Sequence, residues 1–141
     1  MYAERMATVA VFNANEDVVE LLRLVVQQAG HRVVTAHVPD IKRGEVDVAA
    51  FVQQHDPSVI VYDIPVPYEQ NWTFLKLVRE APAMRGRVFV LTTTHKANLE
   101  RLVGPTDAIE ILGKPFDLNQ VVEAVNRAVA RQQAGSGGAP S

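Results

Sequence analysis

The stretch from Pro57 to Pro67, PSVIVYDIPVP, constrains the fold of this chain more than any other segment. Its β-branched apolar residues 59–61 lead to a carboxylate at Asp63, and the two prolines that follow prevent a strand from continuing with normal pairing. A strand that is apolar throughout is buried on both faces, as in the centre of a parallel sheet, and ligands collect beyond the carboxyl ends of such strands. We therefore expect a parallel sheet with Asp63 at its functional edge.

Short apolar runs of this kind alternate with helical patterns along the chain. The expected strands are residues 8–12, 31–36, 58–63, 88–92 and 108–112. The expected helices are residues 16–29 capped by Asn15, 46–54, a helix capped by Asn71, 96–103, and a last helix capped by Asp117. Residues 37–45 and 81–87 are expected to be loops, and helical spacing includes Leu21 and Leu77 in the apolar faces of their helices.

Each connection between expected strands is long enough for a right-handed βαβ unit, so the strands should pair in parallel. The pattern predicts an α/β fold: a flavodoxin-like (βα)5 doubly wound sheet, covered on both faces, with strand order 2-1-3-4-5. This order places the ends of the first, third, fourth and fifth strands along one rim.

The composition favours a single globular domain at residues 1–133 followed by a disordered tail at 134–141, AGSGGAPS. A net charge of -2 gives no reason to expect nucleic-acid binding, and the lack of cysteine excludes disulfides, thiolate metal sites and thiol nucleophiles. The N-terminal MYAERMA lacks the apolar core of a signal peptide, and no apolar run reaches the roughly 18 residues that cross a bilayer. We expect a cytoplasmic protein with no membrane contact.

The rim of the predicted sheet gathers the candidate site residues Asn13, Asp63, Thr92 and Lys114. The alternative for each residue taken singly is a solvated loop carboxylate or helix-cap partner at Asp63, a strand-end hydroxyl without a role at Thr92, and a surface lysine at Lys114. Their common place at neighbouring strand ends favours a shared chemical role. The four histidines are scattered without metal-binding spacing, so metal ligation by histidine is not expected.

The segments DIPVP from Asp63, VLT ending at Thr92 and GKPF holding Lys114 together resemble the receiver domain of two-component response regulators. The resemblance extends from Thr8 to Arg131. It implies that Asp63 accepts a phosphoryl group from a histidine kinase, that the Thr92 hydroxyl bonds a phosphoryl oxygen, and that Lys114 neutralises charge.

The chain departs from that family at the metal site. Receiver domains have two acidic residues directly after the first strand that hold Mg²⁺, and here Asn13 and Ala14 stand in those positions. Alanine offers no ligand, and loss of one charge pair costs about 1 kcal/mol in water and about 4 kcal/mol at an effective dielectric near 20. We expect weak or absent Mg²⁺ binding, through Asp63 and weakly Asn13, with Glu16 and Asp17 as possible substitute ligands.

The chain also departs from the family at the conformational switch. The aromatic residue that lies three positions before the lysine in receivers is Ile111 here, and Thr93 and Thr94 follow the switch hydroxyl where a small residue is usual. Isoleucine has no polar tip to hold it at the surface, so Ile111 should stay buried whatever the state of Asp63.

These observations support two main hypotheses. The first is a single-domain atypical response-regulator receiver in phosphorelay signalling, a phosphoprotein with Asp63 as phosphoacceptor and weakened Mg²⁺ binding. The second is a phosphorylation-independent pseudo-receiver that acts as a protein-interaction module. An enzyme such as a phosphatase would need a general base or second carboxylate that the rim lacks, so no enzymatic activity is expected.

The resemblance also implies partners. A histidine kinase or phosphotransfer protein would act on Asp63. A downstream protein would dock on the face formed by helix 4 (96–103), strand 5 (108–112) and helix 5, the last helix. A weak homodimer is expected on the same face because the first of these helices is short and the last carries the small residues Ala124, Ala128 and Ala130.

Overall fold

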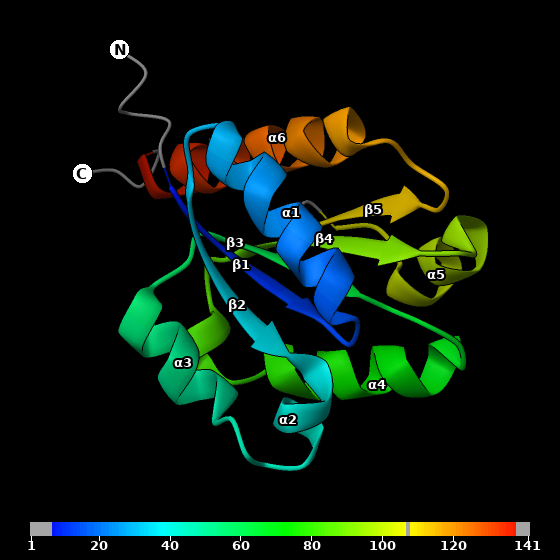
Figure 1. Cartoon of the computed structure of the whole chain (residues 1–141). Helices are drawn as coiled ribbons and strands as arrows, with labels where there is room; N and C mark the ends of the chain where they lie inside the picture. The colour runs from blue at the N-terminus through cyan, green and yellow to red at the C-terminus, as the bar shows by residue number, and fades with distance from the viewer. Residues whose placement is uncertain (1–6, 107, 138–141) are drawn as a thin grey trace.

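The computed structural model describes residues 7–106 and 108–137, which form a central sheet between two layers of helices (Figure 1). The strands are β1 (Thr8–Asn13), β2 (Arg32–His37), β3 (Val59–Asp63), β4 (Val88–Thr93) and β5 (Ile109–Gly113). All pair in parallel in the order β2-β1-β3-β4-β5. The predicted fold class and strand order are therefore confirmed.

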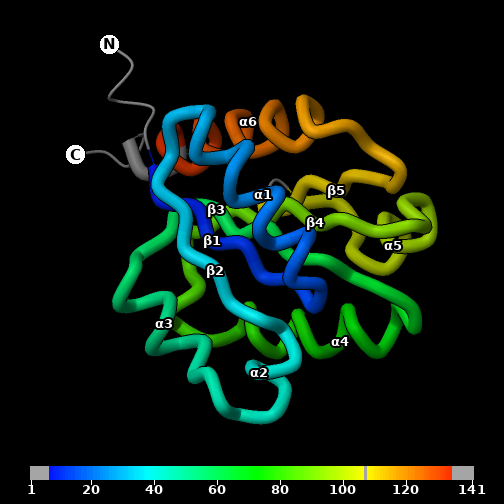
Figure 2. Tube along the Cα trace, viewed as in Figure 1, coloured from blue at the N-terminus to red at the C-terminus, as the bar shows by residue number. Residues whose placement is uncertain are grey.

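The helices are α1 (Glu16–Gln28), α2 (Val38–Lys42), α3 (Val48–His55), α4 (Tyr68–Arg79), the short 3-10 helix η2 (Pro82–Met84), α5 (Lys96–Val103) and α6 (Leu118–Gly137). Helices α1 and α6 lie together on one side of the sheet, and α2, α3 and α4 lie on the other, as the trace in Figure 2 shows. Leu99 of α5 packs into the same core cluster as α3 and α4. No helix in the described part of the chain is long and apolar enough to span a bilayer.

Alternation along the strands divides the core between the two faces. Ala10, Phe12, Ile60 and Tyr62 point toward the α3 and α4 side, while Val9, Val11, Val59 and Val61 point toward α1 and α6. All of these residues are at most 2% exposed. β1 and β3 therefore contain continuous apolar runs because both faces of the sheet are buried.

Residues 37–45, predicted to be a loop, contain α2, so that prediction is wrong. Pro39 lies in the first turn of the helix, where a backbone N–H has no helical partner to lose. Val38 and Ile41 are buried under this turn. Tertiary burial of two apolar side chains therefore outweighs the proline and the charges that favour a loop.

Helix α4 begins three residues before the predicted cap, because Asn71 lies inside the helix rather than at its start. The Asn71 amide donates to the carbonyl oxygens of Pro65 and Pro67, both at 3.0 Å. Asn71 therefore stabilises the proline-containing loop that follows β3.

The predicted N-caps of two other helices are confirmed. At α1, Asn15 Oδ1 accepts hydrogen bonds from two backbone N–H groups, and at α6, Asp117 Oδ1 accepts a hydrogen bond from Gln120 N.

Two predicted core positions are exposed instead. Leu21 is 46% exposed on α1 and Leu77 is 63% exposed on α4. Leu21 lies at the edge of the buried stripe of α1, and Leu77 lies outside the stripe that Asn71, Trp72 and Leu75 form on α4.

The last helix is longer than predicted. Helix α6 continues to Gly137 through the first part of the expected tail at 134–141, and residues 138–141 lie outside the described residues.

Candidate functional site

Asp63 lies at the carboxyl end of β3, directly opposite Thr92 at the end of β4. The Thr92 hydroxyl donates a hydrogen bond to Asp63 Oδ1 at 2.6 Å, and the Lys114 ammonium lies 2.7 Å from the same oxygen. The Asp63 side chain is 11% exposed and Thr92 is 2% exposed. The three residues singled out from the sequence therefore meet at one carboxylate oxygen.

The backbone after β5 holds Lys114 in this position. Gly113 pairs with Thr93 in the sheet, and Lys114 N donates to the Thr93 carbonyl at 2.7 Å. A Cβ atom at Gly113 would lie 3.1 Å from Lys96 Cβ, so glycine allows the start of α5 to approach the strand. The loop that carries the ammonium is thus anchored to the strand that carries the hydroxyl.

Asn13 and Ala14 occupy the end of β1, at the same rim. Asn13 is 5% exposed, and its Oδ1 already accepts a hydrogen bond from Asn15 N at 2.9 Å. The Ala14 carbonyl accepts from His37 Nε2 at 2.9 Å. The Asn13 side chain therefore stabilises the turn that connects β1 to α1.

A cavity of about 250 Å³ opens beside Asp63, where Ala14 leaves room. Lys42 and Asn71 also line it, and the Lys42 ammonium donates to Asn71 Oδ1 at 2.7 Å. Tyr62 lines its inner side, and burial, together with the Asp63 charge, raises the pKa of the Tyr62 phenol. No sequence pattern pointed to Lys42, because it lies in the segment predicted to be a loop.

A second contact that the sequence did not predict joins α4 to the loop after β4. The Tyr68 hydroxyl lies 2.7 Å from Thr94 Oγ1, and the Tyr68 ring packs 5.1 Å from the His95 ring. Thr93 is fully buried, and its Oγ1 accepts from His95 N at 3.3 Å. The hydroxyls that follow Thr92 are therefore engaged in structural contacts.

Comparisons with known proteins agree on one family of domains, although no protein-family model matches the chain. The chain is 32% identical over 124 residues to the response regulator Rre1 of Synechocystis sp., a match that covers 82% of this chain and 54% of Rre1. It thus spans about half the length of that curated relative. The chain is a receiver domain of the response-regulator family.

Solved structures show the same fold for this receiver domain. Chemotaxis protein CheY4 of Vibrio cholerae superposes with a TM-score of 0.65 at 23% identity, covering 87% of this chain and 98% of CheY4. The receiver domain of Francisella response regulator 1452 superposes with a TM-score of 0.67 at 20% identity, covering 89% of this chain and 98% of that domain.

The residues of this receiver domain do not fit a tight Mg²⁺ site. Mg²⁺ prefers hard oxygen ligands in a near-octahedral arrangement and usually relies on one or two carboxylates besides water. Asn13 Oδ1 is already used by the backbone, and Ala14 has no ligand atom. Within residues 7–106 and 108–137, no group of three or more His, Cys, Asp or Glu side chains is placed to hold a metal ion. Glu16 and Asp17 are exposed in the first turn of α1, and their role as substitute ligands stays a prediction.

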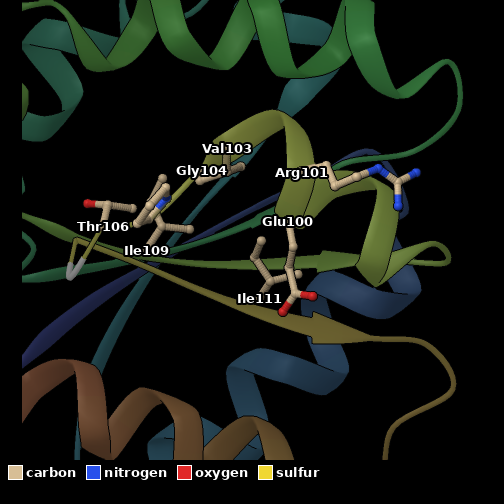
Figure 3. Close-up of a pocket in the computed structure, with 8 residues that line it drawn as sticks. Glu100, Arg101, Val103, Gly104, Thr106, Ile109 and Ile111 are labelled. Atoms are coloured by element: carbon tan, nitrogen blue, oxygen red, sulfur yellow. The ribbon is translucent and has the colours of Figure 1, made fainter.

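The position of the family's aromatic switch is occupied by Ile111, which is 9% exposed on β5. It forms one wall of a cavity of about 550 Å³ between β5 and α5. Figure 3 shows Ile109 and Ile111 in this cavity, with Glu100 beside Ile111 and Arg101 pointing away from it. The receiver domain therefore has an aliphatic side chain in the wall of this cavity at position 111.

Proposed function

We propose that this receiver domain is an atypical signalling domain of two-component systems, in which Asp63 accepts a phosphoryl group from a histidine kinase or phosphotransfer protein in the cytoplasm. The observation that most supports this proposal is the convergence of Thr92 and Lys114 on Asp63 Oδ1, at 2.6 and 2.7 Å. Those two groups are suited to bind phosphoryl oxygens once the carboxylate is phosphorylated. Mg²⁺ binding is weak in this proposal because the carboxylates after β1 are missing.

The proposed step forms an acyl phosphate. An Asp63 carboxylate oxygen bonds to the phosphorus atom of a phosphohistidine, the P–N bond breaks, and the imidazole leaves with the electron pair and takes a proton from solvent. The Lys114 ammonium moves from the carboxylate to the new phosphoryl oxygens, and the Thr92 hydroxyl donates to one of them. Positioning and charge neutralisation account for most catalysis of phosphoryl transfer. The domain itself turns over no substrate and is not an enzyme.

Small phosphodonors test this proposal. The wild-type chain is incubated with acetyl phosphate or phosphoramidate, with Mg²⁺ or with EDTA, and its intact mass is measured. We expect a gain of one phosphoryl group that is lost in Asp63→Asn and kept in Asp56→Asn, which removes an exposed carboxylate at the other end of the sheet. No gain in the wild-type chain under any of these conditions would contradict the proposal.

A second candidate function is a phosphorylation-independent pseudo-receiver that acts through protein contacts. The standing ion pair between Lys114 and Asp63, at 2.7 Å, favours it, because the carboxylate is already neutralised without a metal ion. Trp72, 5% exposed in the core behind β3, reports on the two alternatives. A change in its fluorescence with beryllofluoride supports the first function, and no change with millimolar metal and beryllofluoride supports the second.

The face of α5, β5 and α6 is the proposed docking site for a downstream protein and for a weak homodimer. The cavity in Figure 3 supports this proposal, since its aliphatic floor of Ile109 and Ile111 has a polar rim. The small residues of the last helix do not all lie on this surface, as was predicted: Ala124 and Ala128 are fully buried against the sheet, and only Ala130 of the three is exposed. Sedimentation that shows a strict monomer at high concentration would argue against the dimer.

A further inference from the structure

A third cavity, of about 930 Å³, lies at the amino ends of β4 and β5, at the edge of the sheet opposite Asp63. Four arginines line it: Arg79 at the end of α4, Arg85 and Arg87 before β4, and Arg131 on α6. Its apolar lining comes from Met84, Val88 and two alanines. No acidic residue is among the described residues that line it. Four cationic side chains therefore line one cavity of a chain whose net charge is -2.

Two of the four arginines have their charge compensated inside the protein. Arg87 Nη1 donates to Asp56 Oδ1 at 2.9 Å and to the Pro57 carbonyl at 2.6 Å. Arg131 Nη2 donates to Glu110 Oε1 at 3.0 Å. These contacts hold the two guanidinium groups at the cavity wall.

Arg79 and Arg85 have no carboxylate partner among the described residues. Arg79 is half-buried with its guanidinium carbon 5.3 Å from the centre of the Phe89 ring, and burial lowers the pKa of this guanidinium. A half-buried cation without a counter-ion is unfavourable unless a ligand or a dipole compensates it. The carboxyl end of α4 supplies part of that compensation to Arg79. Arg85 lies beyond the helix and is exposed, so its guanidinium group is accessible to a ligand.

We propose that this cavity binds a small phosphate-bearing molecule, with Arg79 and Arg85 holding the phosphate groups and the apolar wall holding the rest of the ligand. Guanidinium groups match phosphate oxygens with paired hydrogen bonds, which a lysine ammonium does not provide. A concave site with an apolar wall and a few charged groups is typical of small-molecule pockets of this volume. A nucleic acid would instead call for an extended basic surface, which a chain of net charge -2 does not favour.

Titration calorimetry with pyrophosphate and with ADP tests the site on the full chain. Binding of both at similar affinity identifies the phosphate groups as the recognised part, and tighter binding of ADP shows that the apolar wall contributes; either result supports the proposal. Sulfate and a poly-glutamate peptide are titrated in parallel. Equal binding of sulfate, or tighter binding of the peptide, would overturn it in favour of general anion binding or an acidic protein partner.

Three variants locate the binding. We expect Arg79→Gln and Arg85→Gln each to weaken pyrophosphate binding by about tenfold, since each removes a charged hydrogen-bond donor. Arg85 is exposed, so its substitution leaves the fold intact and keeps the test valid if the Arg79 variant is unstable. Arg32→Gln, at the exposed amino end of β2 on the far side of the sheet, should stay within about twofold of wild type. Loss of binding in all three variants, or in neither cavity variant, would contradict the proposed site.

Because these experiments use no phosphodonor and no metal ion, their outcome is independent of the chemistry at Asp63. The cavity lies at the amino ends of the strands and Asp63 lies at their carboxyl ends. If the chain binds pyrophosphate in this way but accepts no phosphoryl group, the result supports the phosphate-binding cavity and contradicts the proposed function of Asp63.

Discussion

Lys114 and Thr92 share one oxygen of Asp63: the ammonium of Lys114 and the hydroxyl of Thr92 lie 2.7 and 2.6 Å from Asp63 Oδ1. The Asp63 side chain is 11% exposed, whereas that of Lys114 is 35% exposed, so the carboxylate depends on these partners more than the ammonium does. A partly buried carboxylate that loses a partner retains a desolvation cost.

The ion pair should contribute measurably to stability. We expect Lys114→Gln to lower the free energy of unfolding by about 1–2 kcal/mol, with a coupling energy of about 1 kcal/mol in the double-mutant cycle with Asp63→Asn. Urea denaturation of the four proteins measures this. Lys76→Gln, an exposed position on α4, is the matched control and should change stability by less than about 0.5 kcal/mol. A coupling energy of zero would mean that the pair is held by the fold without stabilising it.

The Thr92 hydroxyl should matter more than its methyl group. Thr92→Val keeps the shape but removes a hydrogen bond to a charged group, which costs about 1.5–3 kcal/mol. Thr92→Ser keeps the hydroxyl and loses one methyl group, which costs about 1 kcal/mol because the site is 2% exposed. Thermal or urea unfolding distinguishes the two. If the serine variant were the less stable, packing rather than the hydrogen bond would dominate at this position.

Restoring the missing carboxylates should restore Mg²⁺ binding. In the double variant Asn13→Asp, Ala14→Asp, the new side chains would lie at the end of β1, beside the cavity that contains Asp63. We expect Mg²⁺ affinity to rise by roughly tenfold to thousandfold per added charge pair. Calorimetry or Trp72 fluorescence measures it. Asn15→Asp adds an acidic group at the exposed helix cap and is the control; an equal gain there would show that nonspecific charge is responsible.

Tyr62 should give a pH dependence at high pH. Burial raises the pKa of its phenol above the ordinary value of 10.0. Above pH 10 the unfolded chain loses this proton while the folded chain keeps it, so the unfolded state binds fewer protons and folding stability falls as pH rises. The loss is about 1.4 kcal/mol per pH unit in this window and is absent below pH 10.

Urea denaturation from pH 9 to pH 11.5 measures this slope. Tyr62→Phe should remove it, and Tyr68→Phe, which retains Tyr62, should not. The same slope in wild type and in the Tyr62 variant would assign it to other groups.

Several elements could be predicted because their cause is local. The apolar runs of β1 and β3 follow from burial on both faces of a sheet, and Asn15 caps α1 through contacts within three residues. Other elements could not be predicted. Helix α2 forms because Val38 and Ile41 are buried against the rest of the protein, and Asn71 faces inward to hold the carbonyls of Pro65 and Pro67.

The sequence by itself determined the strand order, the helices other than α2 and η2, the rim on which Asp63, Thr92 and Lys114 lie, and the lack of acidic residues at positions 13 and 14. Only the tertiary structure decided that Thr92 and Lys114 meet at the same carboxylate oxygen, and that Arg79 and Arg131 line one cavity. The physical reason is separation along the chain. Patterns of burial repeat every two to four residues and can be recognised locally, whereas contacts between distant segments depend on how the helices and loops pack against the sheet.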